Sequence, residues 1–334
     1  MKPLTLYLPG IVLSFLIALV ASWAGAMVPL VGGAVFGILI GITAGSLFAV
    51  GEPVSPGVQF TSKKILQWAV MILGSGLGLG QVYATGASSL VIILVTISSA
   101  LIVAVIAGRF LRVPFNLKSL IGVGTAICGG SAIAAVAPVI EAEDQEISYA
   151  ISTVFMFNVI AVFIFPPLGH LFGMSQEGFG LFAGTAINDT SSVVAAGYTY
   201  GNAAGDHATI VKLTRTLMII PIALAFVVVM MRRKKAAQGG TGASFTIAGI
   251  FPWFILGFLA MSALNTSGIL GVHVISVLKD AGKFLIVMAL SAIGLKTDLR
   301  KMLATGPRPM VLGLIVWVTV TLTSILVQRI GGQW

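Results

Sequence analysis

Residues 88–107 read SSLVIILVTISSALIVAVIA and contain no charged side chain, and the charge-free stretch around them extends from position 65 to position 108. About twenty apolar residues suffice for a helix to cross the hydrocarbon core of a bilayer. Within that core only helices and closed barrels pair all their backbone groups. A barrel would show alternating segments of about ten residues, whereas this run is longer and apolar on every side. The stretch therefore predicts a transmembrane helix.

Similar runs occur along the whole chain, in which 57% of the 334 residues are hydrophobic and only 9% are charged. Soluble domains carry about 25% charged residues. The single cysteine, Cys128, excludes an intramolecular disulfide framework. We therefore expect an all-α polytopic membrane protein, one integral membrane domain over residues 1–334, with about eleven transmembrane segments. They are expected at 4–23, 29–49, 65–80, 88–107, 118–140, 147–169, 177–199, 207–231, 245–263, 276–295 and 309–328.

The basic residues predict the orientation of these segments. A net charge of +9 would suggest a nucleic-acid partner in a soluble protein. Here Lys and Arg lie between the apolar runs, so we interpret them as signals of membrane topology and expect no nucleic-acid partner. The pattern predicts a bacterial-type inner membrane protein with its N-terminus cytoplasmic, its C-terminus external and an external acidic loop at 141–146. Fourteen of the nineteen basic residues would then be cytoplasmic: Lys2, Lys63, Lys64, Arg109, Arg112, Lys118, Arg232, Arg233, Lys234, Lys235, Lys296, Arg300, Lys301 and Arg308.

Glycine-rich features punctuate the predicted helices. Gly33, Gly37, Gly41 and Gly45 form a stripe on one helix face, where another backbone can pack closely. GSGLGLG at 74–80 predicts an end or break in a helix, because each glycine weakens it by about 1 kcal/mol. The segment 231–244, basic and then Gly-rich, predicts a mobile cytoplasmic loop.

The most informative feature is an internal repeat. GTAICGGSAIAA at 124–135 resembles GTAINDTSSVVA at 184–195, at an offset of sixty residues. Each places a small polar cluster in the middle of a predicted segment, which favours a break between two half-helices. The start of a half-helix presents free N–H groups and the positive end of a dipole, which suits an anion. Paired interrupted segments indicate a secondary transporter's binding site, although short matches also arise by chance in Gly/Ala-rich helices.

The direction of the two interrupted segments stays open at this stage. As full crossings, 118–140 and 177–199 would run the same way, whereas an inverted repeat requires opposite directions. As re-entrant hairpins they would enter from opposite sides with the same charge count.

Ionisable residues inside the membrane are usually functional. Lys212 and Arg215 lie three apart on one helix, and Lys283 lies near Lys279 and Asp280. A polar cavity with excess positive charge would suit an anion, whereas the structural alternative is that Lys212 extends to an interface and Asp280 pairs with Lys283. The expected substrate-binding residues are Thr125, Gly129, Gly130, Ser131, Asn158, Asn188, Thr190, Ser191, Ser192, Lys212, Arg215 and Lys283.

Asp189 has two compatible interpretations: it could carry a coupling proton or sodium ion, or cap the following half-helix. The histidines are scattered, and no metal-binding spacing or nucleotide-binding loop is present. We therefore expect no metal, no cofactor and no enzymatic activity.

Five motifs in order, GTAICGGSAIAAVAP, FMFNVIAVFIFP, GTAINDTSSVVAAG, VKLTRTLMIIP and ALSAIGLKTDL, resemble the YeiH-like sulfate exporter family over nearly the whole chain. That family is similar to bile-acid/sodium symporters and cation–proton antiporters. The resemblance implies an extra N-terminal helix (1–28), two inverted repeats (29–170 and 171–334) with broken helices, an elevator mechanism and a homodimer. It implies pairing of the fifth and tenth segments, whereas the internal match pairs the fifth and seventh.

The sequence thus predicts a secondary transporter that exports a small inorganic anion, and the family resemblance implies that this anion is a sulfur oxyanion such as sulfate or sulfite. A sodium- or proton-coupled carrier of organic acids is the nearest alternative. An anion channel and an intramembrane enzyme are alternatives from other classes. Export of an anion from a negative-inside cell is favoured by about 2.3 kcal/mol per charge per 100 mV, so a uniporter is also compatible.

Overall fold

The structure, a computed structural model, describes residues 6–28, 32–48, 51, 53–236, 253–297 and 306–334, and it is helical without strands over these residues. Five helical segments are long and apolar enough to cross a membrane: Leu8–Met27, Leu79–Phe110, Gln145–Leu171, Asn202–Met230 and Pro307–Ile330. Shorter apolar helices accompany them. The prediction of an all-α polytopic membrane protein is confirmed.

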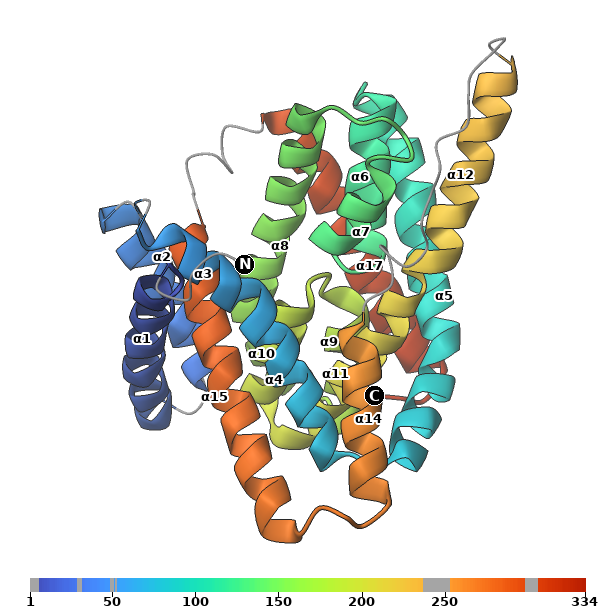
Figure 1. The fold of residues 1–334 in the computed structure, drawn as a ribbon. Coiled ribbons are helices and arrows are strands. Elements are labelled where there is room, and N and C mark those ends of the chain that lie inside the picture. The colour runs from blue at the N-terminus through green and yellow to red at the C-terminus, as the bar shows by residue number, and fades with distance from the viewer. Residues whose placement is uncertain (1–5, 29–31, 49–50, 52, 237–252, 298–305) are drawn as a thin grey trace.

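One group of helices, here called the panel, packs together. It combines helices from the first quarter of the chain, residues 8–76, with helices from residues 254–296. Its members are α1 (Leu8–Met27), α2 (Gly32–Phe48), α3 (Ser55–Phe60), a π-helical turn (Thr61–Ile65), α4 (Leu66–Leu73), a 3-10 turn (Gly74–Gly76), α14 (Phe254–Thr266) and α15 (Val272–Lys296). In Figure 1, α1, α2, α3 and α15 lie on the left and α14 lies nearer the middle.

The second group, here called the hairpin body, contains the two interrupted segments and the helices packed on them (Figure 1). Its members are α5 (Leu79–Phe110), α6 (Phe115–Ala126), α7 (Gly130–Val136), α8 (Asp144–Leu171), α9 (Gln176–Ala186), α10 (Thr190–Tyr200), α11 (Asn202–Leu217), α12 (Ile219–Ala236) and α17 (Pro307–Ile330).

The glycine stripe of α2 packs against α15, as close backbone packing predicts. A Cβ built on Gly41 would lie 2.4 Å from the carbonyl oxygen of Ser291, and one on Gly45 would lie 2.5 Å from that of Leu295. Larger residues would force these helices apart. The second predicted glycine feature is also found, because α4 ends at Leu73 and α5 begins at Leu79.

The panel meets the hairpin body mainly along α10, which packs against α2 and α15. Apolar side chains fill this seam, with Val35 and Ile38 from α2, Val194 from α10, and Ile286 and Leu290 from α15. The seam joins segments far apart in the sequence through contacts that are largely non-polar.

The two ends of the molecule differ in charge. The end of α12 and the start of α6 lie at one end, upper in Figure 1, and the loop from α14 to α15 lies at the other. We call the upper end the basic end, because Arg109 lies in the last turn of α5, Arg112 follows that helix, and Lys118 lies in the first turn of α6. The predicted loop 231–244 is corrected in part, since α12 remains helical to Ala236 and residues 237–244 lie outside the described residues.

Candidate functional site

The first interrupted segment is a hairpin. α6 ends at Ala126 and α7 begins at Gly130, and the side chain of Ile133 lies against Gly124, 2.8 Å from the position of a Cβ there. Because a residue of α7 lies against a residue of α6, the two helices run back alongside one another. The tip needs a glycine, because Gly129 has a φ of +67°, a region that costs other residues roughly 1–2 kcal/mol.

The mouth of this hairpin lies at the basic end. Asn116 at the start of α6 donates from Nδ2 to Oε2 of Glu146 at the start of α8, over 3.1 Å. The acidic segment 141–146 is therefore on the same side as the basic start of α6. This corrects the expected external position, which assumed that 118–140 crosses the membrane once.

The second interrupted segment is also a hairpin. α9 ends at Ala186 and α10 begins at Thr190. The side chain of Gln176, at the start of α9, lies against Gly201 directly after α10 and accepts a hydrogen bond from the N–H of Ala204 at 3.1 Å. Both ends of the segment therefore lie together.

The two hairpins enter from opposite ends of the molecule, because α8 joins the mouth of the first to the mouth of the second. α8 has 28 residues, which is about 42 Å at 1.5 Å per residue and longer than a hydrocarbon core of about 30 Å. Two of the eleven predicted segments thus fold back. The hairpin alternative left open by the sequence is the one that the structure adopts.

The tips of the hairpins meet beside α8. A Cβ on Gly129 would lie 3.8 Å from Cβ of Asp189 and 3.8 Å from Nδ2 of Asn158. Oδ1 of Asn158 accepts from the N–H groups of Asn188 at 2.9 Å and Asp189 at 3.2 Å. The mid-helix asparagine therefore satisfies the backbone of the second tip, a role that the sequence did not specify.

Lys212 bridges the two tips. Its ammonium, fully buried on α11, donates to the carbonyl oxygen of Ile127 at 2.5 Å and to that of Ile187 at 3.2 Å. The first half-helices end at these carbonyls, where the helix dipole is negative. The ammonium charge therefore compensates the ends of two half-helices at once.

Arg215, one turn further along α11, bridges the same tips. It donates from Nε to the carbonyl oxygen of Ala126 at 2.7 Å, from one terminal nitrogen to that of Thr125 at 2.9 Å, and from the other to that of Ile187 at 3.3 Å. Its side chain is also fully buried. The structure brings this predicted cationic pair to the tips, where its donors bind backbone oxygens.

Asp189 caps α10, as one of its two predicted roles requires. Its Oδ2 accepts from the N–H groups of Ser191 at 3.0 Å and Ser192 at 3.4 Å, and from the hydroxyl of Ser191. An acidic N-cap satisfies donors that the helix itself cannot pair. The coupling role stays a prediction.

Two predicted residues at the first tip leave room for a ligand. Gly130 and Ser131 are exposed, and no neighbouring atom lies within 4 Å of a Cβ built on Gly130. The remaining predicted residues at the tips are Thr125, buried on α6, and Thr190, half-buried at the start of α10.

Asn188 is the unsatisfied group of the site. Its side chain is fully buried, yet neither Oδ1 nor Nδ2 has a hydrogen-bond partner. A buried polar group without a partner costs about 1–3 kcal/mol, and such groups call for an explanation such as a bound ligand or water. Asn188 therefore stays a candidate for substrate contact.

Lys283 does not join the tips. It lies on α15 with its ammonium 5.8 Å from the ring centre of Tyr198, near the far end of α10. The structural alternative, in which Asp280 pairs with Lys283, is not found either, because Asp280 is exposed and the ion pair of this region is between Lys279 and Asp206, at 3.2 Å.

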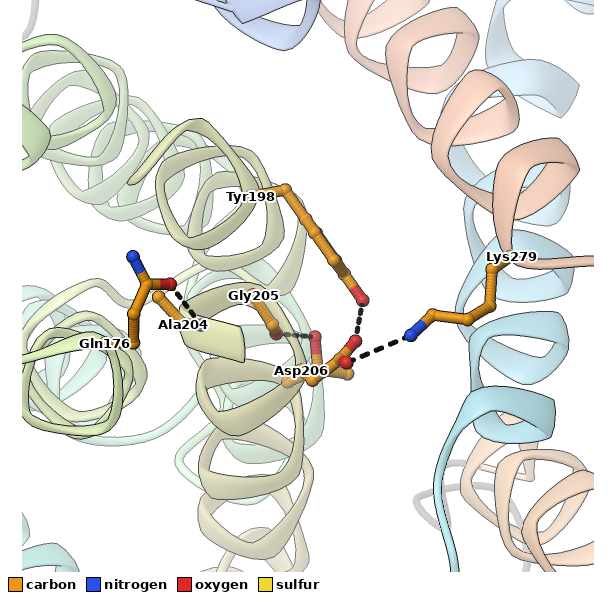
Figure 2. Close-up of polar contacts among 7 residues, drawn as sticks. Gln176, Tyr198, Ala204, Gly205, Asp206 and Lys279 are labelled. Atoms are coloured by element: carbon orange, nitrogen blue, oxygen red, sulfur yellow. Dashed lines mark hydrogen bonds and ion pairs between the residues drawn. The ribbon is translucent and has the colours of Figure 1, made fainter. Parts of the chain in front are cut away.

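Asp206 was missed by the sequence reasoning. It lies on α11, accepts from the hydroxyl of Tyr198 on α10, and pairs with Lys279, which reaches across from α15 (Figure 2). The available signal was that Asp206 is the sole acidic residue between Asp189 and Asp280. This contact joins the hairpin body to the panel.

Comparison with known proteins identifies the family. The protein-family model described as Conserved hypothetical protein 698 matches residues 9–313. The chain belongs to the UPF0324 membrane protein family. It is 48% identical over 334 residues to a UPF0324 membrane protein of Streptococcus pyogenes serotype M6, with 98% of each chain covered. It is 46% identical to relatives of the same name in Fusobacterium nucleatum, over 97% of this chain and 98% of the relative, and in Streptococcus mutans, over 98% of each.

The described residues contain no group of three or more His, Cys, Asp or Glu side chains that could hold a metal ion. The polar groups at the tips are amides, hydroxyls, one carboxylate and two cations. Their chemistry suits binding and compensation of charge.

Proposed function

We propose that this UPF0324 member is a secondary transporter, and not an enzyme, that exports a small inorganic anion by alternating access. A sulfur oxyanion, sulfate or sulfite, is the proposed substrate, in keeping with the resemblance to YeiH-like exporters. The observation that supports a transporter most directly is the pair of oppositely directed hairpins whose tips meet beside two buried cations. Interrupted helices from opposite sides are the structural pointer to a transporter's binding site.

The charge at the tips favours an anion. Lys212 and Arg215 contribute two positive charges and Asp189 one negative charge, and all three lie against the same two breaks. The cations are held by backbone oxygens, so in this proposal they compensate a nearby anion through space. The open position at Gly130 and Ser131 and the unsatisfied amide of Asn188 are the proposed direct contacts.

The arrangement of the two groups of helices suits alternating access. The hairpin tips are tied together by Lys212 and Arg215, so we expect both hairpins to move as one unit. The seam between α10 and the panel is mainly apolar over the described residues, and the charged side chains beside it are Lys283, which lies over the ring of Tyr198, and Lys279, which pairs with Asp206 on α11. In the proposed elevator mechanism the hairpin body slides along this seam, and the panel forms the fixed part of a homodimer.

The basic end is the proposed cytoplasmic side of an inner membrane, following the distribution of Lys and Arg. The start of α1 packs on α3 at this end, so the N-terminus would be cytoplasmic. The indole of Trp334 donates to the carbonyl of Phe172, where α8 ends at the opposite end of the molecule, so the C-terminus would be external. Outward movement of an anion then follows the membrane potential, at about 2.3 kcal/mol per charge per 100 mV.

The deciding experiment is flux of labelled sulfate and sulfite in proteoliposomes with an imposed voltage, with and without pH and sodium gradients. Saturable, voltage-sensitive movement of either anion supports the proposal. Sodium-dependent flux of organic acids, without movement of either anion, would instead favour the coupled carrier in which Asp189 binds the ion. Conductance far above carrier turnover would favour a channel.

A further inference from the structure

A cavity of about 320 Å³ opens between the start of α1 and the segment formed by α3 and the π-helical turn. It lies in the panel, on a different set of helices from the hairpin tips. The residues that line it combine rings, polar side chains and two cations: Tyr7, Ser55, Pro56, Gln59, Phe60, Lys63 and Lys64.

Two glycines explain why a cavity forms here. α1 and α3 touch at Gly10 and Gly57, where a Cβ on Gly57 would lie only 2.7 Å from Cα of Gly10. Next to this contact, the rings of Tyr7 and Phe60 have centroids 5.3 Å apart and form one wall. The helices are thus held together at one point and separated by rings at the next.

The π-helical turn supplies the charge. It spans Thr61–Ile65 and carries Lys63 and Lys64, both exposed. π-helical turns within α-helices are rare and occur often at functional sites. α15 packs against this turn, and the charge of Lys296 at its end is close enough to Lys63 for the two to repel.

Among the residues that the structure describes, neither Lys63 nor Lys64 forms an ion pair with a carboxylate, and the ion pair found there joins Lys279 to Asp206 at the other end of the molecule. Three lysines that lie close together without an acidic partner among the described residues would be stabilised by an anion. The cavity beside them is large enough for a phosphate group and lined by hydroxyl and amide groups that can donate to it.

Exposed apolar side chains lie next to two of the residues that line the cavity, Tyr7 and Phe60. α1 exposes Leu8 and Val12, and Trp68, whose ring packs edge-on against Phe60 with centroids 5.5 Å apart, is 47% exposed. Tryptophan and tyrosine are enriched where hydrocarbon meets headgroups. A free ion in water would gain nothing from this border, whereas a lipid would place its acyl chains along it.

We propose that the cavity between α1 and the π-helical turn binds the phosphate headgroup of an anionic phospholipid through Lys63 and Lys64. Basic pockets between transmembrane helices on the cytoplasmic side are suited to such headgroups. The site gives α1 a role that is separate from transport, because the lipid would fix α1 against α3. The inference rests on the proposed orientation of the basic end, but not on the proposed transport activity.

The test is thermal unfolding of the purified full chain in neutral detergent with phosphatidylglycerol, phosphatidylcholine or inorganic phosphate added. The variants are Lys63→Gln/Lys64→Gln and a control, Arg109→Gln/Arg308→Gln, which removes the same charge at exposed positions on α5 and α17. We expect phosphatidylglycerol to raise the midpoint of wild type and control by a few degrees and that of the lysine variant much less. Phosphatidylcholine should have little effect on any of them.

Equal responses of all three proteins to phosphatidylglycerol would overturn the site. A full effect from inorganic phosphate at the same concentration would overturn the lipid and indicate a free-anion site. The four substituted side chains are exposed, so all variants should fold. Lipid that co-purifies with wild type, and is depleted in the lysine variant by mass spectrometry, is the independent check.

Discussion

Lys212 and Arg215, one turn apart on α11, both donate to the carbonyl oxygen of Ile187, at 3.2 Å and 3.3 Å. Each also donates to the end of α6, so the two cations tie one hairpin tip to the other. Buried cations near a substrate site would ordinarily be assigned to the substrate. Here their hydrogen bonds go to the backbone, which makes them part of the scaffold that positions the tips.

This arrangement predicts that Arg215→Gln destabilises the fold as well as reducing transport. The shorter amide cannot reach the three carbonyl oxygens, and each buried acceptor left without a partner costs about 1–3 kcal/mol. We expect the free energy of unfolding to fall by about 2 kcal/mol or more, measured by denaturation in detergent. Arg109→Gln, at an exposed position on α5, should change it little. Unchanged stability and unchanged anion affinity in Arg215→Gln would remove both the scaffold role and the cationic site.

Asn188 should show the opposite pattern. Replacing its unpartnered amide with Leu removes two buried polar groups, so stability should rise by about 1 kcal/mol or more, while anion flux should be lost. Thr153→Val is the matched control, because the Thr153 hydroxyl is also buried and unpartnered, on the side of α8 that faces Gly313. We expect that variant to gain stability and keep its flux. A loss of stability in Asn188→Leu would mean that the amide is structurally paired.

The sequence predicted the parts of the site that depend on local chemistry. Glycine and short polar residues disfavour a helix, so both breaks could be located at 128–131 and 188–192. Close packing of the α2 glycines and capping by Asp189 follow from equally local rules. The direction of the hairpins could not be deduced, because hydrophobicity and loop charge are the same for two crossings and two hairpins.

Non-local partners were beyond sequence reasoning for a physical reason. The pattern shows that Lys212 and Arg215 need compensation but not that carbonyls at 125–127 provide it, because backbone acceptors are the same at every residue. Lys283 was grouped with the site on charge alone, and the fold directs it toward Tyr198 instead. Asp206 and Lys279 are 73 residues apart, and they meet only because α10 and α11 pack together and α10 packs against α15.

Gly130→Val tests whether the first tip admits a ligand. The position has open space around it, so valine should fold normally, with stability within about 0.5 kcal/mol of wild type, but should occupy the space beside Ser131 and abolish flux. Gly124→Val is the contrasting variant, since its side chain would meet Ile133 at 2.8 Å and Val154 at 3.1 Å. That variant should lose stability. Wild-type flux in a folded Gly130→Val protein would place the anion elsewhere.

The Asp206–Lys279 pair predicts how the two groups of helices separate. It lies at the end opposite the basic end and bridges α11 and α15, with the side chain of Asp206 13% exposed and that of Lys279 26% exposed. Because solvent partly screens it, a double-mutant cycle with Asp206→Asn and Lys279→Gln should give a coupling of about 0.5–1 kcal/mol in the free energy of unfolding. The charge swap Asp206→Lys/Lys279→Asp should recover part of it.

The functional readout is access to the hairpin tips from that end. In a Cys128→Ser background, Ser131→Cys can be labelled with a membrane-impermeant maleimide applied to either face of vesicles. Loss of the ion pair should let the hairpin body leave the panel more often at this end, so Asp206→Asn should speed labelling from the face opposite the basic end. Glu177→Gln, which removes a carboxylate at the same end outside the pair, should leave that rate unchanged. Identical labelling rates for Asp206→Asn and its parent would show that the pair does not hold this end closed.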